Sequence, residues 1–170
     1  MSDPEILFGI YCPPHPQPLL TPEASEGYGR LRDAFETCRK RIEESEADLI
    51  LVYSTTWPSI IGHQIQGHPE PEWVHVDDDF HYLGSMPYKF KMDTEFAEKF
   101  RECAESRGLQ SRTVAYDGFP IDTGSIVALK LLNPDNRIPA CIVSSNMYAN
   151  RAETIVPVSY THLTLPTSND

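Results

Sequence analysis

The strongest constraint on the fold is an unbroken apolar run at Asp48–Ser54, DLILVYS, which ends abruptly in polar residues. A strand with one face in water alternates apolar and polar side chains, whereas a strand covered on both faces does not. The run therefore predicts a buried strand of a parallel sheet with helices on both sides. Because open α/β sheets place their sites at the carboxyl ends of strands, the next residues, Thr55, Thr56 and Trp57, mark a candidate site.

The rest of the chain alternates between short apolar runs and segments with helical periodicity. Further strands are predicted at Ile6–Tyr11, near Trp73–Val76 and Tyr88–Lys91, at Arg112–Ala115 and at Ile138–Ser145. Helices are predicted from Thr21, as N-cap before Pro22, through an apolar stripe ending at Ile42, from Asp93 to Gly108, and from Asp122 to Leu132. This alternation predicts the α/β class with a mostly parallel central sheet.

Composition excludes several classes of protein. A net charge of −11 over 170 residues argues against nucleic acid or an anionic membrane as the main partner. No apolar run approaches the roughly 18 residues that a membrane span needs. The four cysteines are spaced singly, which excludes the usual zinc spacings and predicts reduced thiols in a cytoplasmic protein.

His15 is the first candidate site residue. It lies in the loop CPPHPQP directly after the predicted first strand, where flanking prolines would hold a metal ligand or a general base rigidly. The alternative is an ordinary polar side chain with local hydrogen bonds. A second candidate is the turn Tyr116–Ser125, which opens a helix whose amides could bind an anion or a carbonyl oxygen, or which is simply a capped helix.

Histidines 63, 68, 75 and 81, with Asp77, Asp78 and Asp79, suggest a metal site at first sight. Non-haem iron(II) commonly takes two histidines and one carboxylate, and HVDDDFH (His75–His81) contains both ligand types. However, no spacing in this segment matches a known metal motif. The sequence therefore favours a solvated polar loop over a metal site.

Five motifs, in order, resemble one family: IYCPPHPQPLL, LILVYSTTWPSIIGHQ, HVDDDFHYLG, AYDGFPIDTGSI and IVSSNMY. Together they are similar to the class III extradiol ring-cleavage dioxygenases of the LigB type, and especially to the non-catalytic type of aminophenol dioxygenase subunit. The resemblance runs from Ile6 to about Pro157. It implies a three-layer α/β/α fold and the opening of aromatic rings with molecular oxygen.

The resemblance also implies a ligand set. Members bind iron(II) through two histidines and a glutamate; His15 matches the first histidine, but Thr56 stands at the position of the second. The glutamate and an acid/base histidine come from a C-terminal half that this chain lacks. Iron binding is therefore not expected here. The resemblance implies a diverged or non-catalytic subunit, paired with a homologous subunit in a homo- or hetero-oligomer.

Two alternatives stay open. In the first, His63 replaces the missing ligand, and the chain is part of an active iron(II) dioxygenase acting on a catechol or 2-aminophenol type of ring. In the second, the chain is a metal-free binding or assembly subunit that uses the same cleft, with an aromatic small molecule as a possible ligand.

The last segment, Val158–Asp170, differs from the rest because it has no apolar period and no charge before its final residue. Val158–Thr167 resembles the translation of a sequencing-library adapter. We therefore expect residues 1–157 to be the N-terminal part of a LigB-type domain and residues 158–170 to be a non-native tail. A genuine disordered tail is the alternative.

Overall fold

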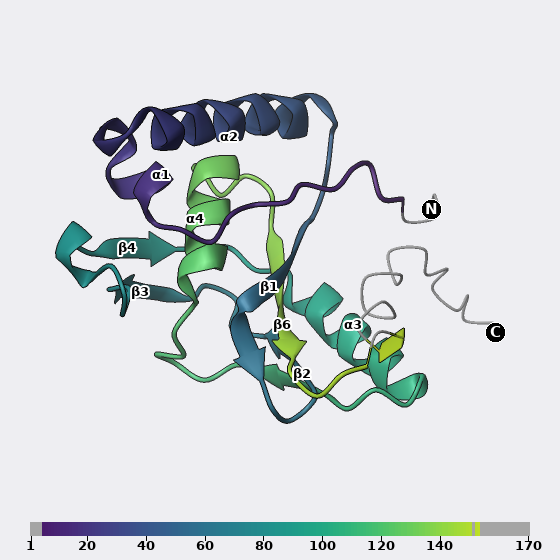
Figure 1. Cartoon of the computed structure of the whole chain (residues 1–170). Coiled ribbons are helices and arrows are strands. Elements are labelled where there is room, and N and C mark those ends of the chain that lie inside the picture. Colours follow the sequence, from purple (N-terminus) through teal and green to yellow (C-terminus); the bar gives the residue numbers. More distant parts are fainter. Residues whose placement is uncertain (1–4, 151, 154–170) are drawn as a thin grey trace.

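A computed structural model describes residues 5–150 and 152–153 of the chain (Figure 1). The helices are α1 (Gln17–Leu20), the 3-10 helix η1 (Pro22–Ala24), α2 (Glu26–Glu44), the 3-10 helix η2 (His81–Leu83), α3 (Thr94–Ser106) and α4 (Thr123–Leu132). The strands are β1 (Ile50–Ser59), β2 (His63–Gln66), β3 (Glu72–His75), β4 (Met86–Lys89), β5 (Ser111–Val114) and β6 (Ala140–Asn146). The expected tail, residues 158–170, lies outside the described residues.

The central sheet has the order β1-β6-β2-β5. β1 pairs in parallel with β6, and β2 pairs in parallel with β5, which confirms a mostly parallel sheet. The two pairs run in opposite directions, because β2 meets β6 antiparallel at Ile65 and Val143. The carboxyl ends of β1 and β6 therefore lie at one end of the sheet, and those of β2 and β5 at the other.

Two apolar clusters cover the two faces of this sheet. Along β1, Ile50 and Val52 pack against a cluster formed with α2 and α4, whereas Leu51 and Tyr53 pack against a cluster formed with α3. Such alternation means that both faces of the strand are covered, as the unbroken apolar run predicted. The three-layer α/β/α arrangement is confirmed.

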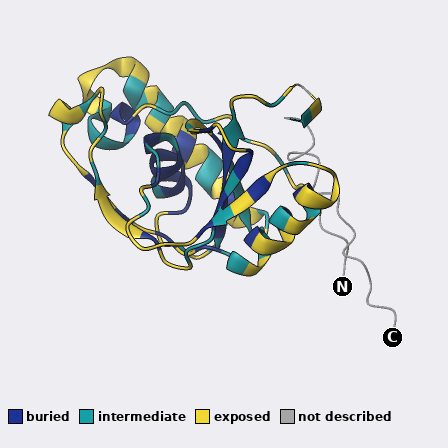
Figure 2. Cartoon of the chain, turned by 90° about the horizontal axis from the view of Figure 1, so that it is seen from below, coloured by how far each residue is buried: buried dark blue, intermediate teal, exposed yellow. Residues whose placement is uncertain are grey.

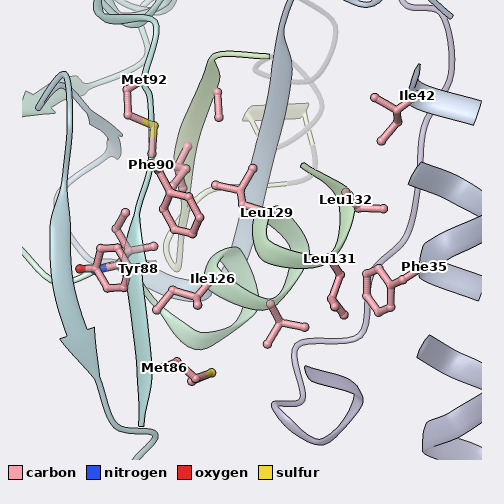
Figure 3. Close-up of a cluster of buried hydrophobic side chains, with 14 residues drawn as sticks. Phe35, Ile42, Met86, Tyr88, Phe90, Met92, Ile126, Leu129, Leu131 and Leu132 are labelled. Carbon is pink, nitrogen blue, oxygen red and sulfur yellow. The ribbon is translucent and has the colours of Figure 1, made fainter. Parts of the chain in front are cut away.

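Helix α4 is the centre of the larger cluster. Its sequence TGSIVALKLL is apolar on all sides, which is typical of a helix buried all round, and Figure 2 shows it in dark blue inside the fold. Figure 3 shows Ile126 and Leu129 facing the aromatic side chains of the β4 region, while Leu131 and Leu132 face α2. Because α4 is packed on all sides in this core, the position of its first turn, Thr123–Ile126, is fixed by the core.

The strand predicted at Ile6–Tyr11 is wrong. The segment has no ladder partner among the described residues, although Phe8, Ile10 and Cys12 pack against the α4 cluster and the Arg41 guanidinium lies 4.6 Å from the Phe8 ring centroid. Its intervening residue Tyr11 is exposed. The apolar run therefore reflects burial of one side of an extended segment and not strand pairing.

The predicted start of the long N-terminal helix is also wrong. Thr21 has an extended φ of −143°, and Pro22–Ala24 forms a separate 3-10 turn. Helix α2 begins after Ser25, whose hydroxyl accepts a hydrogen bond from the Tyr28 N–H at 3.2 Å. By contrast, the predicted caps Asp93 and Asp122 are confirmed. Every helix in the described part of the chain is too short or too polar to cross a membrane.

The turn between β1 and β2 gives a stability prediction. Gly62 has a φ of +67°, and a Cβ at this position would overlap the Gln110 carbonyl, whereas Gly108 has a φ of +81° and open space around it. We expect Gly108→Ala to lower the free energy of unfolding by about 1 kcal/mol through backbone strain alone. Gly62→Ala should cost about 3 kcal/mol because overlap with a backbone atom adds to the strain. Urea unfolding measures the free energy of unfolding of both variants. Equal losses would contradict the overlap with the Gln110 carbonyl inferred at Gly62.

Candidate functional site

The candidate site lies where the end of β1 meets the first turn of α4, and the Asp122 carboxylate is at its centre. Asp122 Oδ2 accepts hydrogen bonds from the Thr56 hydroxyl at 2.6 Å, the Ser54 hydroxyl at 2.9 Å and the Ser125 N–H at 2.9 Å. Asp122 Oδ1 accepts from the Ser125 hydroxyl at 2.8 Å. We call Ser54, Thr56, Asp122 and Ser125 the Asp122 cluster. It joins the sheet to the helix.

An irregularity in β1 turns Thr56 toward α4. Ser54 pairs with Ser144 of β6, but the next paired residue is Pro58, opposite Ser145. The residues between them bulge out of the ladder, and the N–H groups of Thr56 and Trp57 donate to the Ser54 hydroxyl oxygen at 3.2 Å each. Bulges of this kind redirect side chains next to functional sites.

Gly124 lets three segments meet at this point. A Cβ on Gly124 would lie 2.5 Å from the Thr56 hydroxyl oxygen and 3.0 Å from the Pro14 Cβ, so a larger residue would push β1 and the proline loop away from α4. His15 follows Pro14 directly and is exposed, and its ring meets the Phe80 ring edge-on at a centroid distance of 6.0 Å. The proline loop that carries His15 therefore lies against the first turn of α4 and the end of β1.

The HVDDDF loop, His75–Phe80, is hydrogen-bonded to the N-terminal end of α4. The Thr123 hydroxyl donates to Asp77 Oδ2, so its oxygen accepts the hydrogen bond from His75 Nε2 at 2.9 Å. Burial alone would raise the pKa of Asp77, but the Thr123 hydroxyl, the N–H groups of Phe80 and Asp79 and the nearby His75 together hold that pKa below its usual value. His75 and Asp77 therefore hold the loop against the start of α4 through hydrogen bonds, rather than being solvated as the sequence suggested.

The other histidines lie in different surroundings. His68 Nδ1 accepts the Glu70 N–H at 3.2 Å, so its Nε2 donates to Asp117 at 2.9 Å. His81 is exposed. His63 is buried on β2, with Nδ1 3.3 Å from the Ser144 carbonyl oxygen and no hydrogen-bond partner for Nε2 in the described structure. Since Ile65, two residues along β2, packs with α3, His63 faces the α3 side of the sheet and not the α4 side.

The residues of this site do not fit the iron centre that the resemblance implies. Within residues 5–150 and 152–153, no group of three His, Cys, Asp or Glu side chains could hold a metal ion. Thr56 is the decisive position, because its hydroxyl proton is directed at Asp122. Sequence reasoning identified Asp122 only as a helix cap. Its bonds to Ser54 and Thr56 span 68 and 66 residues and leave no local signal.

Comparison with known proteins places these features in a family. Residues 9–154 match the family model described as the catalytic LigB subunit of aromatic ring-opening dioxygenase, and the chain belongs to this family. The sequence resemblance to LigB-type proteins is thus confirmed.

Three relatives show how far the similarity extends. The chain is 29% identical to the alpha subunit of 2-aminophenol 1,6-dioxygenase from Pseudomonas sp, over 88% of this chain and 55% of that protein. It is 30% identical to the beta subunit of the same enzyme, over 86% of this chain and 50% of that protein. It is 22% identical to Escherichia coli 3,4-dihydroxyphenylacetate 2,3-dioxygenase, over 66% of this chain and 41% of that protein. The chain spans about half the length of the two Pseudomonas relatives.

The lowered pKa of Asp77 gives a pH prediction. A depressed pKa in the folded state means that the carboxylate adds stability above its ordinary pKa of 3.8 and loses that contribution as the pH falls through the folded value. We expect Asp77→Asn to be less stable than the unmodified chain at neutral pH, with the difference shrinking in acid. Asp78→Asn is the control, because that side chain is exposed. Thermal unfolding across acidic pH tests this, and parallel curves for both variants would contradict it.

Proposed function

We propose that this chain is part of a LigB-type subunit that has lost iron-dependent ring cleavage and acts by pairing with a homologous subunit. The observation that supports this most directly is the 2.6 Å hydrogen bond from the Thr56 hydroxyl to Asp122, at the position where the family resemblance calls for a histidine ligand. An imidazole offers iron a lone pair, whereas a neutral hydroxyl is a poor ligand beside it.

The Asp122 carboxylate does not supply the missing ligand. Its two oxygens already accept four hydrogen bonds from Ser54, Thr56 and Ser125, and one of those bonds caps α4. Binding a metal would break these bonds and leave the buried Ser54 and Ser125 hydroxyl groups without their partner, which costs roughly 1–3 kcal/mol for each group. Within the described residues, His15 would then be the one residue that matches the ligand set implied by the resemblance.

The relatives support the subunit role. Two of them are the alpha and beta subunits of 2-aminophenol 1,6-dioxygenase, and this chain is about equally similar to both. In the proposed assembly the partner subunit holds the iron(II) and opens an aromatic ring, while this chain contributes the fold and a contact surface. Its four free thiols are in keeping with a reducing compartment such as the cytoplasm.

An active site built from His15 and His63 is the less favoured proposal. The proline loop that carries His15 lies against Gly124 at the start of α4, whereas His63 is buried on the α3 side of the sheet. A metal ion would need both imidazoles within its first coordination sphere, at about 2.1 Å. A metal-free binding or assembly role is the other alternative.

Anaerobic reconstitution with iron(II) tests the proposal. We expect the chain to bind no stoichiometric iron and to open neither catechol nor 2-aminophenol, because its retained ligand set is incomplete. His15→Ala and His63→Ala should leave the low iron content unchanged, and His81→Ala, which alters an exposed histidine, serves as the matched control.

Stoichiometric iron in the unmodified chain that is lost in His15→Ala but kept in His81→Ala would contradict the proposal. Loss in His63→Ala as well would favour the His15–His63 alternative. Ring opening by the chain alone would also contradict the proposal that this chain has lost ring cleavage.

A further inference from the structure

The N-terminal segment runs alongside α2 in the opposite direction (Figure 1). Two contacts fix this arrangement. The Arg41 guanidinium lies 4.6 Å from the Phe8 ring centroid, and the Arg32 guanidinium donates to the Pro18 carbonyl oxygen at 3.2 Å. Residues of rising number along the segment therefore lie opposite residues of falling number along α2.

The same two contacts bring Cys12 opposite Cys38. Along the N-terminal segment, Cys12 lies four residues from the first contact, at Phe8, and six from the second. Along α2, Cys38 lies three residues from the first contact, at Arg41, and six from the second. The two cysteines thus divide the stretch between the contacts in nearly the same proportion, which places them side by side.

Both thiol side chains face the same apolar layer. Cys38 lies three residues after Phe35 and four before Ile42, and these two residues form the buried stripe of α2. Cys12, Ile10 and Cys38 all pack against the α4 cluster. One set of apolar neighbours therefore encloses both sulfur atoms.

The two thiols also affect each other's charge. Burial raises the pKa of the Cys12 thiol to about 11, and the negative charge of a Cys38 thiolate contributes to this rise. Such a charge effect requires that the two groups lie close together, because the interaction falls with distance. It agrees with the side-by-side placement that the contacts of the segment define.

The central sheet separates this pair from the other two cysteines. Cys103 and Cys141 pack in the α3 cluster on the opposite face, and Cys141 is fully buried. Cys12 and Cys38 are only half-buried, so a small molecule can reach them. The pair is therefore both adjacent and accessible.

We propose that Cys12 and Cys38 form a redox modification site, at which hydrogen peroxide converts the two thiols into one disulfide bond. The Cys38 sulfur attacks one peroxide oxygen and the O–O bond breaks, which gives a sulfenic acid on Cys38 and one water. The Cys12 sulfur then attacks the Cys38 sulfur, the S–O bond breaks, and the departing hydroxide takes the Cys12 proton as a second water. The two thiols lose two electrons, and the peroxide gains them.

The order of these steps follows from the surroundings of Cys12. With a raised pKa, Cys12 is protonated at neutral pH and reacts poorly with peroxide, because the thiolate is the nucleophile. Cys38 is therefore the residue that peroxide oxidises, and Cys12 is the residue that resolves the sulfenic acid.

The disulfide would fasten a segment that packing alone holds. Residues 5–15 make no hydrogen bond among the described residues, which is typical of a region that opens at low cost. The segment continues into the proline loop that carries His15 and meets Gly124 at the start of α4. Oxidation would hold this loop in place, and reduction would release it. This role is separate from the proposed loss of ring cleavage.

Peptide mapping of the unmodified chain after mild treatment with hydrogen peroxide tests the proposal. We expect two of the four thiols to be lost, a linked pair of peptides that contains Cys12 and Cys38, and recovery of all four thiols with dithiothreitol. Chymotrypsin should cut after the exposed Tyr11 several-fold more slowly in the oxidised chain than in the reduced chain.

Serine variants test the order of the steps. Cys12→Ser should accumulate a sulfenic acid on Cys38 that dimedone traps, because the resolving thiol is absent, whereas Cys38→Ser should give no labelling at Cys12. Cys103→Ser is the matched control, because it removes a thiol on the other face of the sheet, and it should form the Cys12–Cys38 link as the unmodified chain does.

Four outcomes would overturn the proposal: four intact thiols in the treated unmodified chain, a link between Cys103 and Cys141, a link between two chains, or equal dimedone labelling in Cys12→Ser and Cys38→Ser. The mapping of the unmodified chain decides the matter even if a variant fails to fold. These readouts need no iron, so their failure is distinct from a failure of the proposed loss of ring cleavage.

Discussion

The Asp122 carboxylate is the group on which the arrangement of the site depends. Through Ser54 and Thr56 it holds the bulged end of β1, and through Ser125 it caps the helix that forms the centre of the larger core. The adjacent Gly124 admits the proline loop that carries His15. Because α4 is buried on all sides, its first turn is a rigid support. The end of β1 and the proline loop are both held against this turn.

In the proposed role, this geometry lets a LigB-type chain keep a folded site without the ligand set that the resemblance implies. A histidine at position 56 would offer a lone pair to a metal, whereas the threonine hydroxyl satisfies a carboxylate inside the same chain. The bulge, the close approach at Gly124 and the loop fastened by Thr123 stabilise the fold without a metal ion. This arrangement of the site is therefore compatible with the proposed role in assembly.

The sequence predicted the elements whose signals are local. The apolar run at Asp48–Ser54 and the caps Asp93 and Asp122 were correct because burial on both faces and capping leave a mark within a few residues. The strand at Ile6–Tyr11 was wrong because an extended segment buried on one side can also carry a short apolar run. β2 was missed because HQIQ has only one apolar residue, and the Asp122 cluster could not be predicted because its partners lie far apart in the chain. The reversed direction of β2 and β5 depends on the same long-range pairing.

The most direct test of this account is a double-mutant cycle between Thr56→Val and Asp122→Ala, measured by urea unfolding. If the Thr56 hydroxyl donates a hydrogen bond to Asp122, the effects of the two changes on the free energy of unfolding should be coupled by about 1.5 kcal/mol. This is the usual contribution of a hydrogen bond to a charged group. Thr55→Val, one residue earlier and exposed, should show a coupling near zero with the same Asp122 change. Equal couplings for Thr55 and Thr56 would contradict the view that Thr56 is a structural partner of Asp122.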